Sequence, residues 1–486
     1  MSRPEVITST TAELPCDAVV VGAFTQDGAA VLASPVPGFD DAGTEQLVKA
    51  ISDSGFKASV GSVLVIPTLG MAPARAIAIA GLGKRATASP KHVRKAAASA
   101  ARLLADRVDV ASTLHSAVDS SAHAAAEGFL LGSYKFDKYR SDPSPSKTQR
   151  FAFIGAPEEE MLRGSILAEA TRVARDLVNE PPASLTPRIL VERAREIADV
   201  RGLMFSELND KELEDRGFGG ITGVAQGSFE PPRLIHLKYS PSGATRKVAI
   251  VGKGVTFDSG GLSLKGLQSM MDMKTDMSGG AAVIAAMSAL PRLGSRVEVD
   301  AFVPAVENMP GGRSLKPGDV IRHYGGRTTE VLNTDAEGRL ILADALALAA
   351  ENKPEVIVDI ATLTGSISVA LGNKIAGLFS TSDALTDELR NAATASGESL
   401  WPMPLAEEYV GEIDSQIADC KNVGSRFGGA IIAALFLKAF VPQEIPWAHL
   451  DIAGAARSDK DQDEISKGGT GMGTRTLIRW IEGRAG

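Results

Sequence analysis

The amino-acid sequence predicts an α/β protein of two domains, each built on a mixed or mostly parallel sheet flanked by helices. Three observations support this fold class. The chain has 486 residues, which is more than one domain usually contains. Short apolar runs bounded by glycine, proline or aspartate are typical of strands. These runs alternate with longer helical patterns, and such alternation favours parallel sheets covered on both faces.

The first predicted domain covers residues 1–158. Its strand candidates are residues 18–21, 63–66, 76–79 and 151–154, and its helical patterns cover residues 92–105 and 121–131. A proline- and serine-rich segment at 139–147 is typical of an exposed loop near a domain edge. The helical pattern that follows is assigned to a linking helix over residues 159–178.

The second predicted domain covers residues 179–486 and repeats the order of strand followed by helix. Its strand candidates are residues 248–251, 297–303, 356–360 and 448–452. Helical patterns cover residues 281–290, 339–350 and 431–440. In sheets of this kind, ligands bind at the edge where the parallel strands end.

The overall composition is that of a globular protein, with 44% hydrophobic residues, 23% charged residues and a formal net charge of −8. The first residues lack the apolar core of a signal peptide, and no stretch has the length of a membrane span. Two cysteines, Cys16 and Cys420, favour a reducing compartment without a disulfide framework. We therefore expect a cytoplasmic protein with no membrane partner.

Nucleic-acid binding is an alternative from a different functional class. An acidic chain with 5% aromatic residues offers little attraction for a phosphate backbone. The segment 84–102 contains basic residues that can form a local patch, although a solvated helix face is the simpler interpretation. These residues are Lys84, Arg85, Lys91, Arg94, Lys95 and Arg102. A nucleic-acid partner is therefore not expected.

The segment Asn333–Leu340 contains two carboxylates two residues apart, followed by an arginine. On extended chain, Asp335 and Glu337 point to the same side. Arg339 then lies near a helix N-terminus, which attracts anions. Two such carboxylates favour a metal site, because burying like charges is unfavourable without a cation. The alternative is a helix cap formed by Thr334 or Asp335.

Two more acidic segments follow predicted strands. The segment 253–265 places Asp258 in a glycine-rich turn after the strand at 248–251, and the segment 273–280 carries Asp276. Carboxylates in apolar, glycine-rich surroundings are not typical of solvated turns. None of the six histidines lies in these segments, so a metal site here would consist mainly of oxygen ligands.

Lysines lie among these acidic residues. Lys253 and Lys265 flank the Asp258 turn, and one interpretation is that they are salt-bridge partners. A second interpretation is chemical. Divalent cations lower the pKa of a neighbouring lysine, whose neutral amine can then bind metal. A second lysine that stays charged can stabilise a substrate oxyanion.

These segments resemble the leucyl aminopeptidase (cytosol aminopeptidase) family, the M17 metallopeptidases. Residues 333–340 match the signature octapeptide of that family, and residues 253–265 and 273–280 match its other metal-ligand segments. Further similar segments are residues 176–182, 361–365, 447–454 and 469–477. The resemblance covers residues 165–486, so the larger C-terminal domain is expected to be catalytic.

The resemblance implies a site with two metal ions. Lys253, Asp258, Asp276 and Glu337 would bind the first ion, whereas Asp258, Asp335 and Glu337 would bind the second. Lys265 would be the electrophilic lysine, and Arg339 would hold a bicarbonate ion that acts as general base. The residues implied for the substrate pocket are Met273, Thr362, Gly365 and Ala453.

The implied activity is that of a metal-dependent aminopeptidase, which releases N-terminal, preferably leucine-like residues from short peptides by two-metal activation of water. The metals would be Mn²⁺ or Zn²⁺, with Mg²⁺ and Co²⁺ as further candidates. The resemblance also implies a homohexamer. The alternatives are another two-metal hydrolase such as a phosphoesterase, a DNA-binding or regulatory protein of the same fold, and an inactive scaffold.

Overall fold

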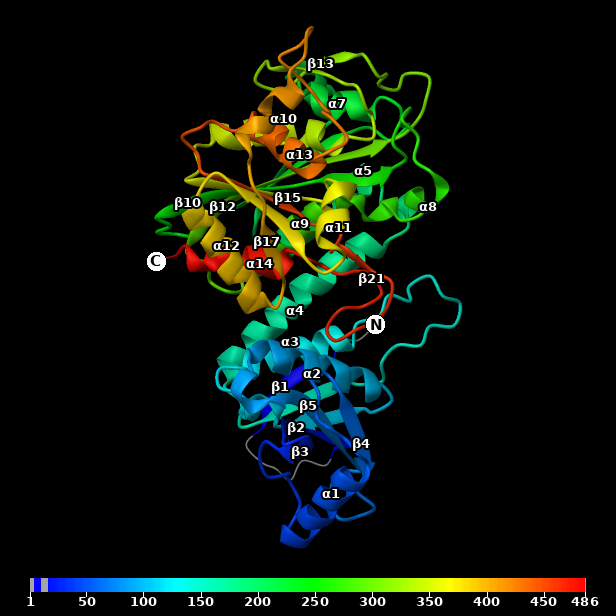
Figure 1. The fold of residues 1–486 in the computed structure, drawn as a ribbon, viewed down its shortest axis with the longest axis vertical. Coiled ribbons are helices and arrows are strands. Elements are labelled where there is room, and N and C mark those ends of the chain that lie inside the picture. The colour runs from blue at the N-terminus through cyan, green and yellow to red at the C-terminus, as the bar shows by residue number, and fades with distance from the viewer. Residues whose placement is uncertain (1–3, 10–15, 486) are drawn as a thin grey trace. The chain divides into compact units, whose positions relative to one another are not determined.

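A computed structural model describes residues 4–9 and 16–485 (Figure 1). The chain forms two compact units. The first contains the described residues up to Arg172 together with residues 459–467, and the second contains residues 173–458 and the chain from Gly468 onward. The boundary after Arg172 falls inside helix α4 (Glu158–Asn179), so one continuous helix contributes residues to both units.

The first unit is built on a seven-stranded sheet in the order β1-β7-β6-β2-β5-β4, with β3 paired to β2. Strands β1, β7, β6, β2 and β5 are mutually parallel, whereas β3 and β4 pair antiparallel. The strands are β1 (Glu5–Ser9), β2 (Ala18–Gln26), β3 (Ala29–Leu32), β4 (Val63–Pro67), β5 (Ala76–Lys84), β6 (Asp109–Ser112) and β7 (Arg150–Ile154). The helices are α1 (Asp41–Asp53), α2 (Pro90–Leu103) and α3 (Ala122–Gly132), with short 3-10 turns η1 (Arg85–Thr87) and η2 (Leu114–Ala117).

Helices α2 and α3 pack against each other closely because α3 carries glycines at the contact. A Cβ on Gly128 or Gly132 would lie 2.3 Å from a backbone carbonyl oxygen of α2. Beside this contact, the Arg94 guanidinium pairs with the Glu127 carboxylate at 2.8 Å, and both side chains are completely buried. This pair neutralises two charges that burial alone would strongly disfavour.

The segment 459–467 is held against α2. Arg102 donates to the carbonyl of Ile465 at 2.8 Å and also to the carbonyl of Asp463. Lys95 pairs with the Asp463 carboxylate at 3.0 Å. Arg94, Lys95 and Arg102 are therefore engaged within this unit, and the nucleic-acid alternative is not favoured.

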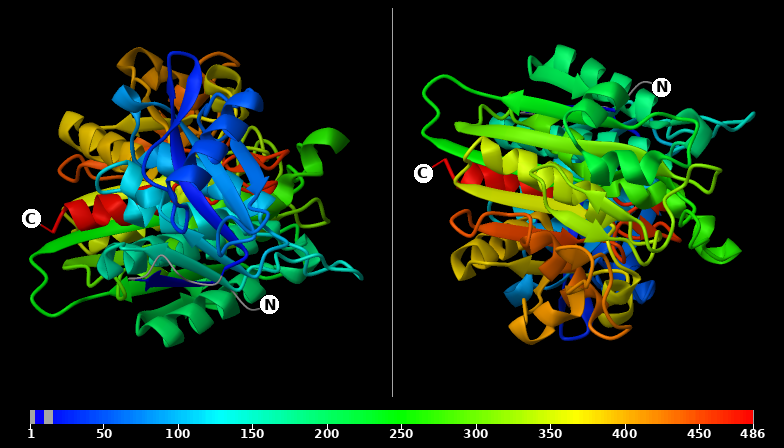
Figure 2. Two further views of the ribbon diagram at one scale, coloured as in Figure 1. Left: turned by 90° about the horizontal axis from the view of Figure 1, so that it is seen from below. Right: turned by 90° about the horizontal axis from the view of Figure 1, so that it is seen from above.

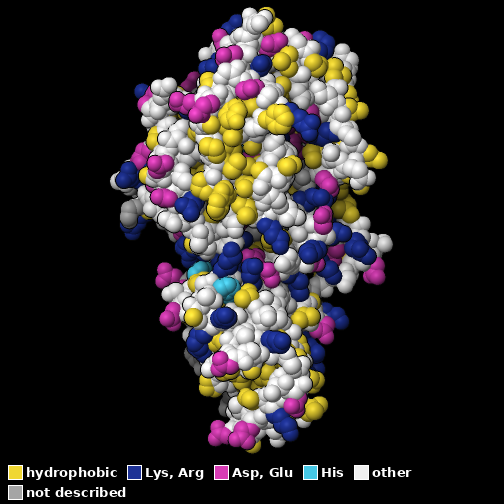
Figure 3. All heavy atoms as spheres, viewed as in Figure 1, with side chains coloured by type: hydrophobic (Ala, Val, Ile, Leu, Met, Phe, Trp, Pro, Cys, Tyr) yellow, Lys and Arg dark blue, Asp and Glu magenta, His cyan; other side chains and the backbone are white. Residues whose placement is uncertain are grey.

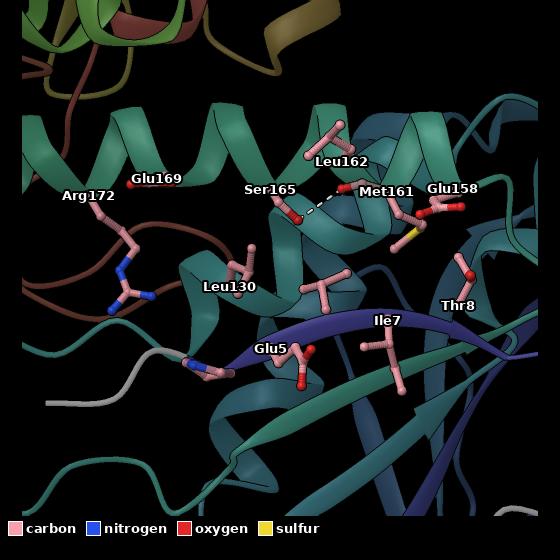
Figure 4. Close-up of a pocket in the computed structure, with 12 residues that line it drawn as sticks. Glu5, Ile7, Thr8, Leu130, Glu158, Met161, Leu162, Ser165, Glu169 and Arg172 are labelled. Carbon is pink, nitrogen blue, oxygen red and sulfur yellow. Dashed lines mark hydrogen bonds between the residues drawn. The ribbon is translucent and has the colours of Figure 1, made fainter. Parts of the chain in front are cut away.

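A hollow of about 580 Å³ lies between β1 and the first turns of α4 (Figure 4). Glu5 comes from the strand, whereas Glu158 and Arg172 come from the helix. The remaining lining is largely apolar and includes Leu130 and Met161. Among the residues that the structure describes, no group of three potential metal ligands lies in this hollow.

The second unit is built on a nine-stranded sheet in the order β17-β16-β19-β15-β10-β12-β9-β8, with β11 paired to β12. Its central strands β19, β15, β10, β12 and β11 are parallel, whereas β9, β8 and β16 run antiparallel to their inner neighbours. The strands are β8 (Met204–Leu208), β9 (Arg233–Tyr239), β10 (Arg246–Gly252), β11 (Gly254–Asp258), β12 (Val297–Asn308), β15 (Val356–Ala361), β16 (Ala376–Ser380), β17 (Leu400–Pro402) and β19 (Trp447–Asp451).

Two small sheets accompany the large one. The first joins β13 (Val320–Arg322), β14 (Thr328–Glu330) and β18 (Cys420–Lys421), and the second joins β20 (Arg457–Ser458) and β21 (Gly468–Gly469). The helices of this unit are α5 (Pro187–Arg201), α6 (Asp210–Asp215), α7 (Gly219–Ala225), α8 (Leu267–Met270), α9 (Ser278–Ala289), α10 (Gly338–Glu351), α11 (Gly365–Leu371), α12 (Asp383–Ser396), α13 (Gly429–Lys438) and α14 (Thr474–Gly483). Its 3-10 turns are η3 (Pro182–Ser184), η4 (Met273–Met277) and η5 (Glu407–Ile413).

Helices α9 and α10 cover opposite faces of the central strands, and Figure 2 shows helices on both sides of this sheet. Both pack on β10, β12 and β15, but only α10 shares a hydrophobic cluster with Ala249 and Val251 of β10. Alternate residues of a strand point to opposite faces, so Val248 and Ile250 face the other layer. Burial on both faces explains why these strands are continuous apolar runs.

Exposed apolar side chains gather over α13 and β17 on one face of the second unit (Figure 3). Large exposed residues of this region include Trp401 in β17, Val410 in η5 and Phe427 just before α13. Apolar surface of this kind is typical of protein–protein contacts.

The predicted fold class is confirmed, because both sheets are mostly parallel and carry helices. Each strand and helix expected from the sequence corresponds to an element within a few residues of its predicted bounds. Cys16 is partly exposed, Cys420 is buried, and both are free thiols. None of the helices in the described part of the chain has the length and apolar character needed to cross a membrane.

Candidate metal centre

The parallel strands of the second unit bring four polar residues to one edge of the sheet. Asp258 ends β11, Asn308 ends β12 and Asp451 ends β19, while Thr362 directly follows β15. Because these strands are parallel, their carboxyl ends meet at the same edge, where open α/β sheets bind ligands.

The chain turns tightly after Asp258, and glycine is required at two positions. Gly260 and Gly261 have φ of +87° and +64°, a region that other residues rarely adopt. A Cβ on Gly260 would lie 2.9 Å from the Asp335 Oδ1, and one on Gly261 would lie 2.7 Å from the Asn308 Oδ1. The backbone of this turn therefore approaches the neighbouring site residues closely.

The octapeptide 333–340 passes through a turn and then enters α10, so Asp335 and Glu337 do not lie on extended chain. Glu337 occupies the N-cap position, and no side chain caps this helix through a hydrogen bond. The Thr334 hydroxyl instead donates to the Gly260 carbonyl at 2.7 Å. A helix cap by Thr334 or Asp335 is therefore wrong, because Glu337 is the N-cap residue. The Thr334 hydroxyl instead connects the two acidic segments.

Carboxylate oxygens of Asp258, Asp335 and Glu337 lie within 4.8 Å of one another, as the ligands of one metal ion would. Lys265 Nζ lies 2.8 Å from the Asp258 Oδ2 and also pairs with Asp335. The Glu337 Oε2 is buried and has no hydrogen-bond partner within the described residues. A buried carboxylate oxygen without a partner fits a site that binds a cation.

Lys253 joins the same cluster from the other side. Its Nζ lies 2.7 Å from the Glu337 Oε1 and 2.8 Å from the Asp276 Oδ2, and it donates to the Thr362 carbonyl at 3.0 Å. The Thr362 hydroxyl donates to the Asp276 Oδ1 at 2.8 Å. All five residues predicted as metal ligands, together with Lys265, thus lie in one cluster.

The charges of this cluster shift the pKa values of its members. Burial and the neighbouring Glu337 raise the pKa of Asp258 to about 6, and burial raises the pKa of Asp276 well above its usual value. Burial alone would lower the pKa of Lys253, but Asp276 and Glu337 raise it above its ordinary value. Lys253 and Lys265 both pair with carboxylates here, and these negative charges raise the pKa of a lysine. The lowered Lys253 pKa expected from the sequence requires divalent cations beside the amine.

Arg339 is the second residue of α10, and its side chain is 7% exposed. Its Nη1 donates to the Asn422 carbonyl at 2.6 Å, whereas its buried Nε has no hydrogen-bond partner in the described part of the chain. Burial lowers the pKa of Arg339 to about 10, although Glu337 and Asp451 oppose that shift. A charged guanidinium with an unused donor, at a helix N-terminus, is suited to binding an anion.

The four residues predicted for the substrate pocket come from three neighbouring segments. Met273 begins η4, three residues before Asp276, and Gly365 begins α11. Asp451 connects the segments that carry Thr362, Gly365 and Ala453. Its carboxylate accepts from the backbone N–H groups of Leu363 at 3.1 Å and Ala453 at 3.2 Å, and from the Thr364 hydroxyl at 2.7 Å.

Three residues of this site received no role from the sequence. Asn308 donates to the Asp258 Oδ1 at 2.8 Å and to the Thr334 carbonyl at 2.9 Å. Asn422 donates through its side chain to the Asn333 carbonyl of the octapeptide, and its own carbonyl accepts from Arg339. The Asp451 carboxylate accepts from the backbone N–H of Leu363 in the loop after β15. Each bonds to groups in segments that are distant in the sequence, which leaves no spacing pattern. Position at the end of an apolar strand was the available signal for Asn308 and Asp451.

A mostly parallel sheet with clustered carboxylates and lysines at its carboxyl edge has the arrangement of a site that binds a divalent metal ion. The model of the cytosol aminopeptidase family catalytic domain matches residues 172–478, and the model of its N-terminal domain matches residues 20–143. The chain belongs to the cytosol aminopeptidase family and is a metal-dependent aminopeptidase that acts on peptides.

Similar proteins of known sequence or structure agree with this assignment. A probable cytosol aminopeptidase of Streptomyces coelicolor is 40% identical, with 98% of each chain covered. The bottromycin maturation enzyme BotP, solved in complex with Mn, is 39% identical with a TM-score of 0.87, over 97% of this chain and 100% of that one. A mutant of tomato leucine aminopeptidase is 34% identical with a TM-score of 0.88, over 99% of this chain and 97% of that one.

Proposed function

We propose that this protein removes N-terminal, preferably leucine-like residues from short peptides with two divalent metal ions. Lys253, Asp258, Asp276 and Glu337 would hold one ion. Asp258, Asp335 and Glu337 would hold the other. Bound there, the two ions would supply an activated water at neutral pH and stabilise the charge that develops on the peptide carbonyl.

The observation that carries this proposal is the grouping of three carboxylates within 4.8 Å, next to the Lys253 and Asp276 pair. Burying this many acidic groups is unfavourable unless cations compensate them. The Glu337 Oε2, which has no hydrogen-bond partner among the residues that the structure describes, supports the same conclusion. Oxygen donors with a single amine suit Mn²⁺ or Zn²⁺, and they also accept Mg²⁺ or Co²⁺.

The remaining polar residues act on the substrate and on protons. Lys265 keeps its charge and stabilises the developing oxyanion through its ammonium group. Arg339 would hold a bicarbonate ion, which would supply a base for the attacking water, and the buried Nε without a hydrogen-bond partner among the described residues supports this role. Met273, Thr362, Gly365 and Ala453 form the pocket for the first side chain. Because one methylene in such a pocket contributes only about 1–3 kcal/mol, other apolar residues would also be accepted.

Three broader features are part of the same proposal. The domain ranges 1–158, 159–178 and 179–486 stay a prediction, and the compact units differ from them because they divide after Arg172 and group residues 459–467 with the first unit. The protein works in the cytoplasm, as the sequence led us to expect. It also assembles as a homohexamer, for which the exposed apolar side chains over α13 and β17 offer a contact surface.

The test combines metal analysis with three substrates. The purified protein should contain two divalent ions per chain by elemental analysis, and it should hydrolyse leucyl-p-nitroanilide. N-acetylated leucyl-p-nitroanilide should not react, because its amino group is blocked. Hydrolysis of a phosphate ester without hydrolysis of leucyl-p-nitroanilide would contradict the proposal.

Two substitutions test the assignment of the ligands. Asp258→Ala or Glu337→Ala should abolish metal loading and hydrolysis together, because each residue would bind both ions. Arg339→Ala should slow turnover while the metal content stays at the wild-type level. Full activity in either ligand variant would refute the two-metal assignment, and loss of metal from Arg339→Ala would refute the anion-holding role.

A further inference from the structure

We propose that Asn422 is a positioning residue, which sets the orientation of the Arg339 guanidinium relative to the octapeptide. This inference rests on the proposed function, in which Arg339 contacts the anion that accepts a proton. Asn422 follows β18, about eighty residues after Arg339 in the sequence, and neither a motif nor a predicted role singled it out.

The side chain of Asn422 binds the first half of the octapeptide and the residue before it. It is completely buried, and its Oδ1 accepts from the backbone N–H of Leu332 at 2.8 Å and of Asn333 at 3.3 Å. Its Nδ2 donates to the Asn333 carbonyl at 2.6 Å and to the Ala336 carbonyl at 3.4 Å. One amide group thus satisfies backbone groups on both sides of the turn that carries Asp335.

The backbone of Asn422 binds Arg339. Its carbonyl accepts from Arg339 Nη1 at 2.6 Å, and its N–H donates to the Glu330 carbonyl at 3.0 Å. That second bond continues the pairing of β18 with β14, so the small sheet and the side-chain bonds to the turn together hold this carbonyl in place. The same residue therefore fixes the turn through its side chain and the arginine through its main chain.

This arrangement determines where the unused donor of Arg339 points. The guanidinium is planar, so a bond at Nη1 defines the direction of the buried Nε, which has no partner among the described residues. If the Asn422 side chain is removed, the segment 420–422 loses its attachment to the turn, and the carbonyl can shift. A displacement of about 1 Å in a reacting group can reduce the rate about 100-fold.

Asn308 provides a matched control because it binds the other half of the cluster. It is also a buried asparagine that bridges distant segments, but it donates to the Asp258 carboxylate. None of the hydrogen bonds that Asn422 forms in the described chain reaches a carboxylate. Loss of Asn308 should therefore weaken metal binding, whereas loss of Asn422 should act through Arg339.

The experiment is a double-mutant cycle with leucyl-p-nitroanilide, together with elemental analysis of each variant. We expect Asn422→Ala to lower kcat by about 10- to 100-fold with an unchanged metal content. In an Arg339→Ala background, the same substitution should change kcat by less than about twofold, because its effect passes through the arginine. Asn308→Ala should lower the metal content and should still lower kcat in the Arg339→Ala background.

Two results would overturn the positioning role. The first is a decrease in kcat on Asn422→Ala that is just as large in the Arg339→Ala background. The second is a loss of metal from the Asn422→Ala variant while it remains folded. Asn422→Ser, which keeps a hydroxyl acceptor, replaces the alanine variant if that variant does not fold. A wild-type protein that leaves leucyl-p-nitroanilide intact would instead refute the proposed function, so the two failures are distinguishable.

Discussion

Substituting Gly338 tests whether the packing around Lys253 controls the metal centre. Gly338 is the first residue of α10, and a Cβ there would lie 2.6 Å from the Cε and 2.7 Å from the Nζ of Lys253. The Lys253 side chain is 3% exposed, so it cannot move out into solvent. A Gly338→Ala variant must therefore displace the amine from the carboxylates that surround it.

The size of this displacement follows from the distances. An ordinary contact of at least 3.4 Å requires the Lys253 Cε to move by about 0.8 Å. The Nζ now lies within 3.0 Å of Glu337, Asp276 and the Thr362 carbonyl, so a shift of that size breaks at least one of these contacts. Overpacking of this kind lowers stability by about 1–3 kcal/mol, whereas alanine in a helix contributes up to about 1 kcal/mol in the opposite direction.

We expect Gly338→Ala to remain folded but to lose metal affinity and catalytic rate by about 10- to 100-fold. Metal titration of the metal-free protein, thermal unfolding and the hydrolysis of leucyl-p-nitroanilide measure these effects. The control is Gly483→Ala in α14, because a Cβ at Gly483 would have no neighbour within 4 Å. Wild-type metal affinity and kcat in Gly338→Ala would show that the position of Lys253 does not control the site, and would refute the reasoning.

Two further predictions concern stability. Glu127→Gln removes the carboxylate that pairs with the buried Arg94 guanidinium at 2.8 Å, so the free energy of unfolding in urea should fall by about 3–5 kcal/mol. Replacing both residues with apolar ones should recover most of that loss, and an equal loss in the double variant would contradict the assignment. The second prediction concerns pH. Burial would lower the pKa of His449, but the Asp359 carboxylate, 2.6 Å from its Nδ1, raises it. A raised pKa in the folded state stabilises the protein fully below the ordinary value of about 6.5, and this contribution is lost as the pH rises through the folded-state pKa. The stability difference between wild type and Asp359→Asn should therefore shrink from mildly acidic to alkaline pH, and a difference independent of pH would refute it.

Central strands such as β2, β5, β10 and β15 could be predicted because they are buried on two faces, whereas the central strand β6 has only four residues and is not among the predicted strands. Burial on both faces produces apolar runs such as Val248–Val251, which can be recognised as strands without knowing which strands they pair with. The antiparallel strands β8 and β9 lie at one side of the second sheet; β9 mixes buried with half-exposed residues, and the residues of β8 are all half-exposed or exposed. Their hydrophobic pattern is weaker, and neither strand is among those predicted from the sequence.

The grouping of these acidic residues and lysines could be predicted because acidic groups in glycine-rich, apolar segments are unusual and resemble a known motif. The conformation of the octapeptide could not be predicted in the same way. Asp335 and Glu337 approach Asp258 through a turn that depends on Thr334, whose hydroxyl bonds to a segment seventy residues away in the chain. Contacts of this kind form only when the sheet brings distant segments together. The spacing of residues within one segment therefore does not predict them.

The segment 459–467 affects the order in which the protein acquires its structure during synthesis. It completes the first unit, where Arg102 and Lys95 bind it, yet it follows nearly all of the second unit in the chain. At about 5–20 residues per second, a ribosome needs about 15–60 s to extend the chain from Arg172 to Lys467. During that interval α2 exposes Arg102 without its carbonyl partners. Most of the first unit is therefore synthesised early, but its last segment is synthesised only near the end of translation. A fragment that ends at residue 172 would lack the segment 459–467.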